Sequence, residues 1–450
     1  MSNERQPDIR SNRLDRDELD RNFGDLHSPL SRSEALIAAD RCYFCFDAPC
    51  TTACPTGIDI PGFIQKIRSD NLRGSARTIL QENIMGGMCA RVCPTEVLCE
   101  EACVRNTHEE QPVAIGLLQR YATDPIFEAQ TPLFTRAPVT GKKVAVIGAG
   151  PAGLSCAHRL ATLGHDVVVF NRDEKPGGLN EYGIAAYKTI DDFAQREVEY
   201  ILSIGGIELK NQQSLGDDFQ LHDLRDAYDA VFIGLGLGST NSLGLDNESL
   251  AGVESAIEYI AELRQADDLG KLPVGRHVVV VGGGMTAIDI AVQSKRLGAE
   301  RVDLVYRRGP EQMGASHYEQ DLARTSGVTI HHWARPIELV GSQHVQAIRF
   351  ERTQLDGDGR LSSAGDPFEL TADTVFKAIG QILDSSLLGA DTAGLEIRHD
   401  RIVVNDAGRT SLSNVWAGGD CVADGDNLTV TAVQQGKVAA IDIDHHLRKE

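Results

Sequence analysis

The sequence predicts a mixed α/β protein whose N-terminal part is all helical. Two observations support this prediction. Eight of the ten cysteines lie between Cys42 and Cys103, in short helical patterns without strand-like alternation. From Lys142 onward the chain twice reads strand, glycine-rich turn, helix and strand, which is typical of βαβ units around a parallel sheet. With 450 residues, the chain is long enough for about three domains.

Charge and composition exclude several classes of partner. A formal net charge of −21 argues against nucleic acid and against anionic membrane surfaces. The longest apolar runs, such as the valines at 278–281, are too short to span a bilayer. The first residues are charged and lack the apolar core of a signal peptide. We therefore expect a cytoplasmic protein that binds neither nucleic acid nor membrane.

The cysteines form two runs. The first reads C-x2-C-x4-C-x3-C-P from Cys42, and the second ends at Cys103. Crowded thiolates repel one another unless a cation lies between them, and a chain without an export signal favours metal over disulfides. Cys54 and Cys93 precede prolines, and in two-cluster ferredoxins the cysteine before proline ligates the other cluster. Two [4Fe-4S] clusters are favoured; a zinc site and a disulfide scaffold remain as alternatives.

The first βαβ unit carries a dinucleotide-binding fingerprint. Gly148 is expected to make the tight turn, Gly150 to let the backbone approach a pyrophosphate, and Gly153 to allow helix–strand packing. The phosphates would meet the start of the helix, at Pro151 and Ala152. Asn171 stands where the ribose-binding acid is usual and is expected to contact the ribose. Gly178 and Leu179, in the next glycine loop, are expected to lie close to the cofactor.

The second βαβ unit repeats the pattern. Its turn and first helical residues are Gly282, Gly283, Gly284, Met285 and Thr286. Its second strand ends in Arg307 and Arg308 instead of an acid, and a cation there suits the 2′-phosphate of NADP. The alternative is a pair of arginines on a surface turn.

This second unit is inserted between two parts of the first. Near the C-terminus, a strand leads to Gly419 and Asp420, and a helix follows near Thr429. Asp420 is placed to accept hydrogen bonds from a flavin ribityl chain. We expect an arm at residues 1–33, a helical iron–sulfur domain at 34–123, a linker at 124–141, an FAD-binding domain at 142–265 and 373–450, and an NAD(P)H-binding domain at 266–372.

With these motifs in view, the C-terminal two-thirds of the chain resemble disulfide-reductase-like flavoproteins with two Rossmann-like domains. The cysteine runs narrow the resemblance to two families. One is the small (β) subunit of bacterial glutamate synthase, and the other is the PreT-like electron-input subunit of bacterial dihydropyrimidine dehydrogenase. The segment at residues 115–125 favours the second, because it is similar to the segment of that family in which a glutamine ligates iron. The similarity covers nearly all of the chain after about residue 30.

The resemblance implies a set of site residues. It assigns one cluster to Cys42, Cys45, Cys50 and Cys103, the other to Cys54, Cys93, Cys99 and Gln119, and leaves Cys89 as a non-ligand. It adds Lys188, Leu215 and Thr429 to the FAD site, and Thr286, Ala378, Ile379 and Gly380 to the nicotinamide nucleotide site. Gly314 stands where the family has a basic residue near the 2′-phosphate, so the choice between NADH and NADPH stays open.

The resemblance also implies a function. NAD(P)H would reduce FAD, and electrons would pass through two [4Fe-4S] clusters to a partner subunit containing FMN and iron–sulfur clusters. That partner, in a hetero-oligomer with this chain, would reduce uracil or thymine to the 5,6-dihydropyrimidine, and no acid or base of this chain would be essential. Two alternatives are input to glutamate synthase or another acceptor, and a redox-inert assembly protein. Thioredoxin-reductase-like activity is disfavoured, because Cys156 and Cys421 are single.

Overall fold

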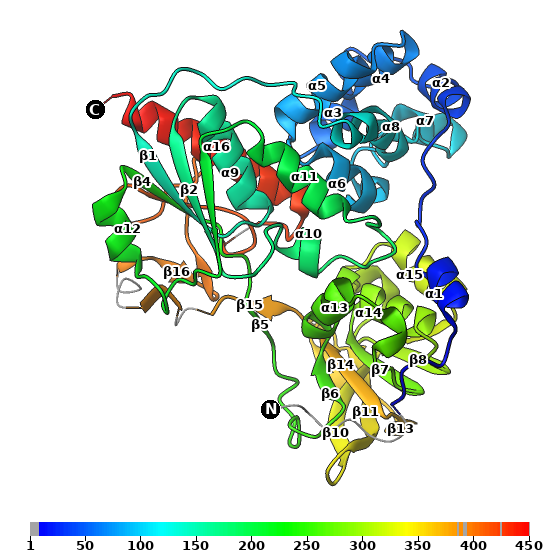
Figure 1. The fold of residues 1–450 in the computed structure, drawn as a ribbon. Helices are drawn as coiled ribbons and strands as arrows, with labels where there is room; N and C mark the ends of the chain where they lie inside the picture. The colour runs from blue at the N-terminus through cyan, green and yellow to red at the C-terminus, as the bar shows by residue number, and fades with distance from the viewer. Residues whose placement is uncertain (1–8, 385–386, 390–393, 424, 450) are drawn as a thin grey trace. The chain divides into compact units, whose positions relative to one another are not determined.

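The computed structural model describes residues 9–384, 387–389, 394–423 and 425–449 (Figure 1). The chain divides into two compact units. Unit 1 comprises Met1–Leu26, Tyr182–Ile190 and Ser239–Gln381, and unit 2 comprises His27–Glu181, Asp191–Gly238 and Ile382–Glu450. Each unit contains one five-stranded parallel sheet. The predicted fold class, mixed α/β with a helical N-terminal part, is confirmed.

The helical part of unit 2 precedes its sheet. Its helices are α2 (Arg32–Asp40), α3 (Pro49–Ala53), α4 (Ile60–Arg68), α5 (Leu72–Glu82), α6 (Gly86–Val92), α7 (Val104–Glu109) and α8 (Ile115–Glu128), with a 3-10 turn, η1 (Thr95–Val97). Ser31 and Glu34 close α2 with a capping box, and Asp59 caps α4. The apolar faces of α4 and α5 are buried, so these short helices are held mainly by packing.

The sheet of unit 2 has the strand order β18-β4-β1-β2-β3. Its strands are β1 (Lys143–Ile147), β2 (Asp166–Asn171), β3 (Ile207–Asn211), β4 (Ala230–Ile233) and β18 (Val415–Ala417), all parallel. Ile147 pairs with both Phe170 and Ile233, so the carboxyl ends of the central strands meet at one edge. Open parallel sheets bind ligands at this edge.

Two helices lie side by side on this sheet, α9 (Pro151–Thr162) and α16 (Thr429–Leu447) (Figure 1). They approach so closely at Gly436 that a side chain there would not fit, since a Cβ would lie 2.1 Å from the carbonyl oxygen of Ala152. The Ser155 hydroxyl donates to the Val433 carbonyl at 2.7 Å. Helix α11 (Phe193–Leu202) shares the apolar cluster of α9 and α16, whereas α12 (Leu221–Ala227) packs in another cluster with the alternate β1 residues Ala145 and Ile147. Helix α10 (Leu179–Tyr182) is a single turn.

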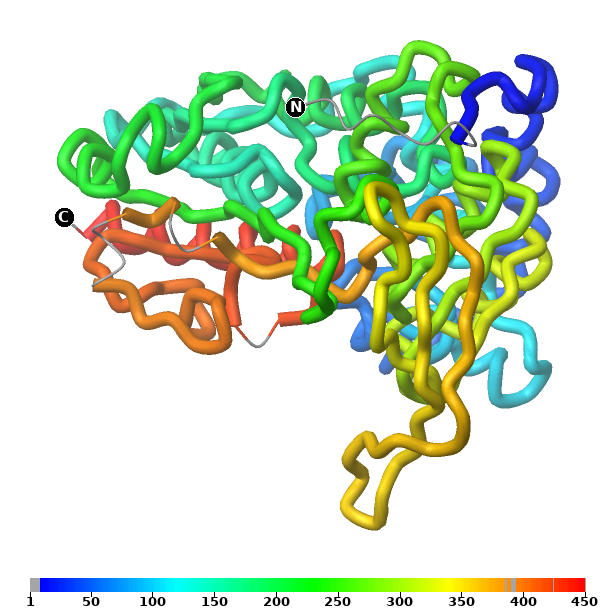
Figure 2. The backbone as a smooth tube through the Cα atoms, turned by 90° about the horizontal axis from the view of Figure 1, so that it is seen from below, coloured from blue at the N-terminus to red at the C-terminus, as the bar shows by residue number. Residues whose placement is uncertain are grey.

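The parallel sheet of unit 1 has the order β6-β14-β7-β8-β9. Its strands are β6 (Val253–Ser255), β7 (His277–Gly282), β8 (Arg301–Val305), β9 (Val328–His331) and β14 (Thr374–Ala378), and its helices include α13 (Ala256–Gln265), α14 (Met285–Arg296) and α15 (His317–Thr325). An antiparallel group follows in the chain, with β10 (Ala334–Gly341), β11 (Val345–Leu355), β12 (Leu361–Ser363) and β13 (Phe368–Thr371). Figure 2 shows the hairpin of β11 and β12 extending from the rest of unit 1.

The units differ from the expected divisions in three places. β14 and β6 pair within the sheet of unit 1, whereas the expected boundaries assign both to the FAD-binding domain. Residues 182–190 also belong to unit 1. β14 ends in a glycine turn that reads the same in either sheet, and β6 is only three residues long, so the sequence did not distinguish the two sheets. In the expected arm, Leu19 of α1 (Arg16–Asn22) and Phe23, which follows this helix, are buried in the core of unit 1. Residues 1–8 lie outside the described residues.

In the part of the chain that the structure describes, the helices are all too short or too polar to cross a bilayer.

Candidate cofactor sites

The three glycines of the turn after β1 lie in different local environments. Gly148 has φ of +98°, and a Cβ there would lie 2.2 Å from the carbonyl oxygen of Gly234. A Cβ at Gly153 would lie 1.9 Å from the carbonyl oxygen of Gly148. At Gly150, by contrast, a Cβ would meet only the Cα of Gly178, at 3.9 Å. The first and third glycines therefore permit packing, and the second leaves the backbone open to a ligand.

Two helix starts lie near this turn without a side-chain cap. Gly150 precedes α9 and Leu428 precedes α16, and neither makes a side-chain capping bond. A Cβ at Gly419 would lie 3.0 Å from the Cβ of Ala152, so the strand end before Asp420 reaches the start of α9. Uncapped backbone N–H groups beside an open glycine suit a pyrophosphate, so this turn fits a dinucleotide.

The other residues expected at FAD take varied places in the structure. The Asn171 amide nitrogen donates to the carbonyl oxygens of Asp173 and Lys175, so it holds the loop after β2. Leu179 begins α10 directly after Gly178. Leu215 is buried in an apolar cluster of unit 2. Burial raises the pKa of Asp420, and Arg401 partly offsets this effect.

Lys188 lies in unit 1, whereas the glycine turn after β1 belongs to unit 2. Its ammonium contacts the carboxylates of Asp289 and Glu319, each at 2.7 Å. Burial alone would lower the pKa of Lys188, but these two carboxylates raise it well above its ordinary value. Within unit 1 the lysine therefore joins its loop to α14 and α15. A contact with FAD stays a prediction.

The turn after β7 repeats the arrangement of the first turn. A Cβ at Gly282 would lie 2.2 Å from the carbonyl oxygen of Ala378, and one at Gly283 would lie 2.4 Å from the Tyr306 ring. A Cβ at Gly284 would have no atom within 4 Å. Gly284 precedes α14 without a side-chain cap, and Met285 and Thr286 form the first helical turn. This turn also fits the phosphates of a dinucleotide.

Two arginines follow β8 at the same sheet edge. Arg307 is exposed and Arg308 is half-buried. Nε of Arg308 is buried and, among the described residues, has no hydrogen-bond acceptor. A buried donor without a partner is costly, and a phosphate oxygen would satisfy it. Gly314 approaches this turn, since a Cβ there would lie 3.7 Å from the Cα of Gly284.

The loop after β14 completes the edge in unit 1. Gly380 has φ of +93°, and its carbonyl oxygen accepts from the Asn241 backbone N–H at 3.1 Å. The Asn241 amide also donates to the carbonyl oxygen of Ile379, at 3.4 Å. Ala378 faces the first glycine of the turn, so the expected nicotinamide nucleotide residues of unit 1 gather at one sheet edge.

All ten cysteines are free thiols, and eight of them form two neighbourhoods. Burial raises the pKa of Cys42, and the nearby Cys45 and Cys103 raise it further. Burial raises the pKa of Cys50 to about 11, with contributions from Cys42 and Cys103. We call these four cysteines the outer set: Cys42, Cys45, Cys50 and Cys103.

The second neighbourhood lies deeper. Burial raises the pKa of Cys93 well above its ordinary value, and Cys89, Cys99 and Cys54 add to the effect. Burial likewise raises the pKa of Cys99, and Glu100, Cys54 and also Cys50 of the outer set raise it further, so the two neighbourhoods adjoin. We call the expected ligands here the inner set: Cys54, Cys93, Cys99 and Gln119.

These thiols fit cluster ligation better than a single ion. Among the described residues, no three His, Cys, Asp or Glu side chains converge tightly enough to hold one metal ion. A zinc site would need four ligands about 2.0–2.3 Å from the metal. A cubane cluster spreads its four ligands more widely, and its iron ions supply the positive charge that crowded thiolates require.

Gln119 is the expected oxygen ligand, and the structure buries it. Its side chain is 8% exposed, and its Nε2 donates to the carbonyl oxygen of Gly86 at 2.7 Å. One turn earlier on α8, the Gly116 N–H donates to Glu100 Oε1 at 2.9 Å. This face of α8 therefore lies against the segment that contains Cys93 and Cys99. The bond to Gly86 fixes the amide and leaves Oε1 as its possible ligating atom.

Helix α6 connects the inner set to the flavin side of unit 2. Glu197 of α11 accepts from the N–H groups of Gly87 and Met88, both at 3.0 Å, and so caps the start of α6. The Asn180 amide donates to the Met85 sulfur at 3.5 Å, and its oxygen lies 3.1 Å from the Thr429 hydroxyl. The opposite end of α6 is followed directly by Cys93.

Glu197 and Asn180 were not predicted as functional residues from the sequence. For Glu197 a signal existed, because it stands among Phe193, Ala194, Val198 and Ile201 on the apolar face of an amphipathic helix. A carboxylate in such a position requires buried donors. For Asn180, next to a glycine loop, no signal separated it from an ordinary loop residue.

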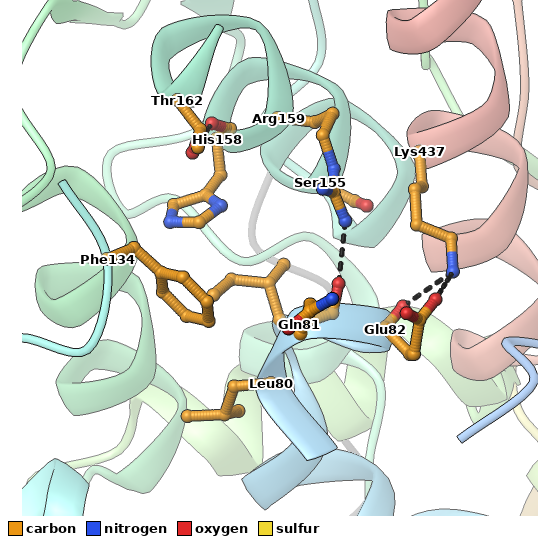
Figure 3. A pocket seen from close by; sticks show the side chains of 10 residues that line it. Leu80, Gln81, Glu82, Phe134, Ser155, His158, Arg159, Thr162 and Lys437 are labelled. Atoms are coloured by element: carbon orange, nitrogen blue, oxygen red, sulfur yellow. Dashed lines mark hydrogen bonds and ion pairs between the residues drawn. The ribbon is translucent and has the colours of Figure 1, made fainter. Parts of the chain in front are cut away.

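A pocket elsewhere in unit 2 is a structural junction (Figure 3). Lys437 bonds to the Glu82 carboxylate at 2.9 Å, and Arg159 donates to the carbonyl oxygen of Gln81 at 2.6 Å. Burial lowers the pKa of His158, which lines the pocket, to about 3. These groups join α5 to α9 and α16, and no expected cofactor residue lines the pocket.

Two family models match the chain. The model described as pyridine nucleotide-disulphide oxidoreductase matches residues 142–436. The model described as dihydropyrimidine dehydrogenase domain II, 4Fe-4S cluster, matches residues 19–131.

Curated relatives align over nearly the whole chain. A glutamate synthase [NADPH] small chain from Escherichia coli K12 is 36% identical, over 93% of this chain and 92% of its own length. The NAD-dependent dihydropyrimidine dehydrogenase subunit PreT from the same strain is 35% identical, over 92% of this chain and 94% of its own length.

Solved structures share the fold. FprA from Mycobacterium tuberculosis, in complex with NADPH, matches with a TM-score of 0.56 at 20% identity, over 70% of this chain and 85% of its own. Thioredoxin reductase from T. acidophilum matches with a TM-score of 0.54 at 20% identity, over 68% of this chain and 99% of its own.

Glu197 makes the stability of the chain depend on pH. Burial raises its pKa from 4.5 to about 8, with Arg91 and Asp124 nearby. The folded state therefore holds this proton more tightly than the unfolded state, and stability falls as pH rises between these two values. Glu197→Gln keeps an accepting oxygen without the charge. We expect its melting temperature, relative to the wild type, to rise between about pH 5 and about pH 8, by the equivalent of a few kcal/mol.

The matched control is Glu199→Gln, at an exposed position of the same helix. Thermal melts of the cofactor-loaded chain at several pH values make the measurement. A Glu197→Gln difference that stays constant with pH would contradict the buried, raised-pKa carboxyl.

Proposed function

We propose, from the premise that this chain belongs to the pyridine nucleotide-disulphide oxidoreductase family, that it is the electron-input subunit of a dihydropyrimidine dehydrogenase. It is an FAD- and NAD(P)-dependent iron–sulfur oxidoreductase of the type shared by PreT and glutamate synthase small chains. Its cofactors are FAD, NAD(P)H and [4Fe-4S] clusters. The proposal adds the acceptor and the partner to this general description.

The buried Gln119 carries the proposal. Its amide is held by the Gly86 carbonyl on the face of α8 that meets the Cys93–Cys99 segment, where a neutral oxygen donor would take the place of a fourth thiolate. Replacing a thiolate by a neutral ligand makes a cluster less negative and favours its reduction. This is the feature that the resemblance assigns to dihydropyrimidine dehydrogenase.

The residues of the chain bind and orient the cofactors. When bound, FAD and the clusters would convert two-electron transfer into one-electron transfers. The open glycines Gly150 and Gly284 admit the two dinucleotide backbones beside uncapped helix starts. Glu197 and Asn180 hold α6 between the flavin turn and the inner set. Cys99 and Gln119 of the inner set are buried, which limits the access of water to them.

Pyrimidine reduction is assigned to a partner. The described residues form the helical part, two five-stranded parallel sheets, one four-stranded antiparallel group and two two-stranded sheets, and none of these is an FMN-binding barrel. We therefore propose a hetero-oligomer with a PreA-like catalytic subunit that contains FMN and iron–sulfur clusters. The 35% identical PreT is itself named as a subunit.

Activity of the purified chain tests this division of labour. We expect NAD(P)H to bleach its flavin and to support reduction of ferricyanide, and uracil to remain unreduced until a PreA-like subunit is added. Reduction of uracil by the single chain would contradict the proposal.

A second candidate is the small subunit of glutamate synthase, favoured by the 36% identical relative. Purification of the tagged chain from its host separates the two. A glutamine-amidotransferase-bearing large subunit as the stoichiometric partner would replace pyrimidine reduction by glutamate synthesis and leave the cofactor sites unchanged.

Arg308 is expected to select NADPH. Its partnerless buried Nε would gain a phosphate oxygen, so Arg308→Ala should raise KM for NADPH about 10- to 100-fold, corresponding to the loss of one charge-assisted contact. KM for NADH should change little, because NADH lacks the 2′-phosphate. Steady-state ferricyanide reduction with each donor makes the measurement.

Arg360→Ala, at an exposed position of unit 1, is the matched control. An equal loss with NADH and NADPH would show that Arg308 holds its loop and does not contact the 2′-phosphate.

A further inference from the structure

The proposed electron route requires an exit from this chain. The inner set is joined through α6 to the flavin side of unit 2, by Glu197 and Asn180. The outer set is carried largely by the loop from Cys42 to Cys50, where all three cysteines are only partly buried. This loop offers electron acceptors too large to enter the chain an approach to the outer set.

Two aromatic side chains of this loop face solvent. Phe46, next to Cys45, is fully exposed, and Tyr43, next to Cys42, is 53% exposed. The Arg105 guanidinium lies 3.9 Å from the centre of the Tyr43 ring, which keeps this ring at the surface. Exposed aromatic residues beside a functional group are typical of protein–protein interfaces.

The backbone of the loop presents these rings in an uncommon conformation. Phe44 has φ of +51° and Ala48 has φ of +29°, both in a region that side-chain-bearing residues seldom adopt. The chain therefore turns sharply on either side of Phe46, which stands between the two turns. Such strained residues occur where surrounding structure or function requires them.

The rings lie among charges of both signs, of which Asp47 and Glu110 are exposed acids and Glu109 is offset by two arginines. Asp47 is exposed beside Phe46, and Glu109 and Glu110 are exposed at the end of α7. Glu109 lies 3.5 Å from the Tyr43 hydroxyl and forms ion pairs with Arg41 and Arg105. The whole chain carries −21. A partner for this surface needs an apolar centre and a basic rim.

We propose that Tyr43 and Phe46, with the acidic residues beside them, form the docking surface for the electron-accepting subunit. The occupant is a redox protein whose own acceptor centre lies behind an apolar patch rimmed by lysine and arginine. This inference rests on the proposed function, because it takes the outer set as the exit for electrons. It adds no chemical step: the two electrons of each NAD(P)H leave one at a time, and NAD(P)+ and a proton remain.

Three variants of the full cofactor-loaded chain test the surface. Phe46→Asp removes the apolar centre, Tyr43→Ser removes the second ring, and Val139→Asp is the control at a 63% exposed apolar residue outside the cysteine segment. The probe is a purified PreA-like subunit at varied concentration, with ferricyanide as the small acceptor. We expect Phe46→Asp to raise KM for the subunit about tenfold or more, as for a central interface residue, and Tyr43→Ser to raise it less.

Ferricyanide reduction and the electron paramagnetic resonance signals should be unchanged in all three variants. If Phe46→Asp alters those signals, its KM is not interpretable, and the docking surface is tested by Tyr43→Ser and the charge reversal Asp47→Lys. Asp47→Lys and added salt should both raise KM for the subunit, because each weakens attraction to a basic rim.

Several outcomes would overturn the proposed docking surface. One is an unchanged KM for the subunit in the Phe46, Tyr43 and Asp47 variants. Another is a larger effect of Val97→Asp, at the exposed residue between Cys93 and Cys99, which would place the exit at the inner set. A third is a wild-type homodimer that Phe46→Asp dissociates, which would identify a second copy as the occupant.

The failure of the proposed function has a different signature. A wild-type chain that reduces ferricyanide but not the PreA-like subunit would remove pyrimidine reduction and leave the surface open to test. The same variants with a glutamate synthase large subunit would then decide the docking surface. Electron transfer to neither subunit would overturn both.

Discussion

The position of helix α6 is the constraint on which the redox arrangement of unit 2 depends. Glu197 caps its first N–H groups, and the carbonyl oxygen of Gly86 holds Gln119. Its last residue leads directly into Cys93. A shift of this one short helix would therefore move both a cysteine and the amide of the inner set. Burial disfavours ionisation of the Glu197 carboxyl group that holds it, and its two backbone donors and the nearby Arg91 partly offset this effect.

The two nucleotide turns reach the same solution in separate units. In each, the first glycine faces a carbonyl oxygen at the end of a neighbouring parallel strand, Gly234 in unit 2 and Ala378 in unit 1. In each, the last residue before the helix is a glycine with open space and no side-chain cap. Close packing behind the turn and free N–H groups in front of it follow from the same parallel-sheet geometry.

Local patterns predicted most of the fold. The sequence places strands after Lys142 and before the turn at Gly282, and helices near Pro151 and Thr429, and the structure contains all of them. Those features depend on short-range periodicity and glycine spacing. The sheet that β14 joins, the carboxylate pair around Lys188 and the cap by Glu197 depend on contacts between residues far apart in the chain. No local pattern specifies such partners, and ligand assignment for Gln119 required resemblance to a family.

The central claim is that unit 2 holds two clusters with separate ligand sets. Cys99→Ser and Cys103→Ser each alter one set, so iron analysis and electron paramagnetic resonance of the two dithionite-reduced variants test it most directly. We predict that each variant loses about half of its iron and a different one of two signals. Loss of the same signal in both variants, or loss of all iron in either without unfolding, would contradict the separation into an inner and an outer set.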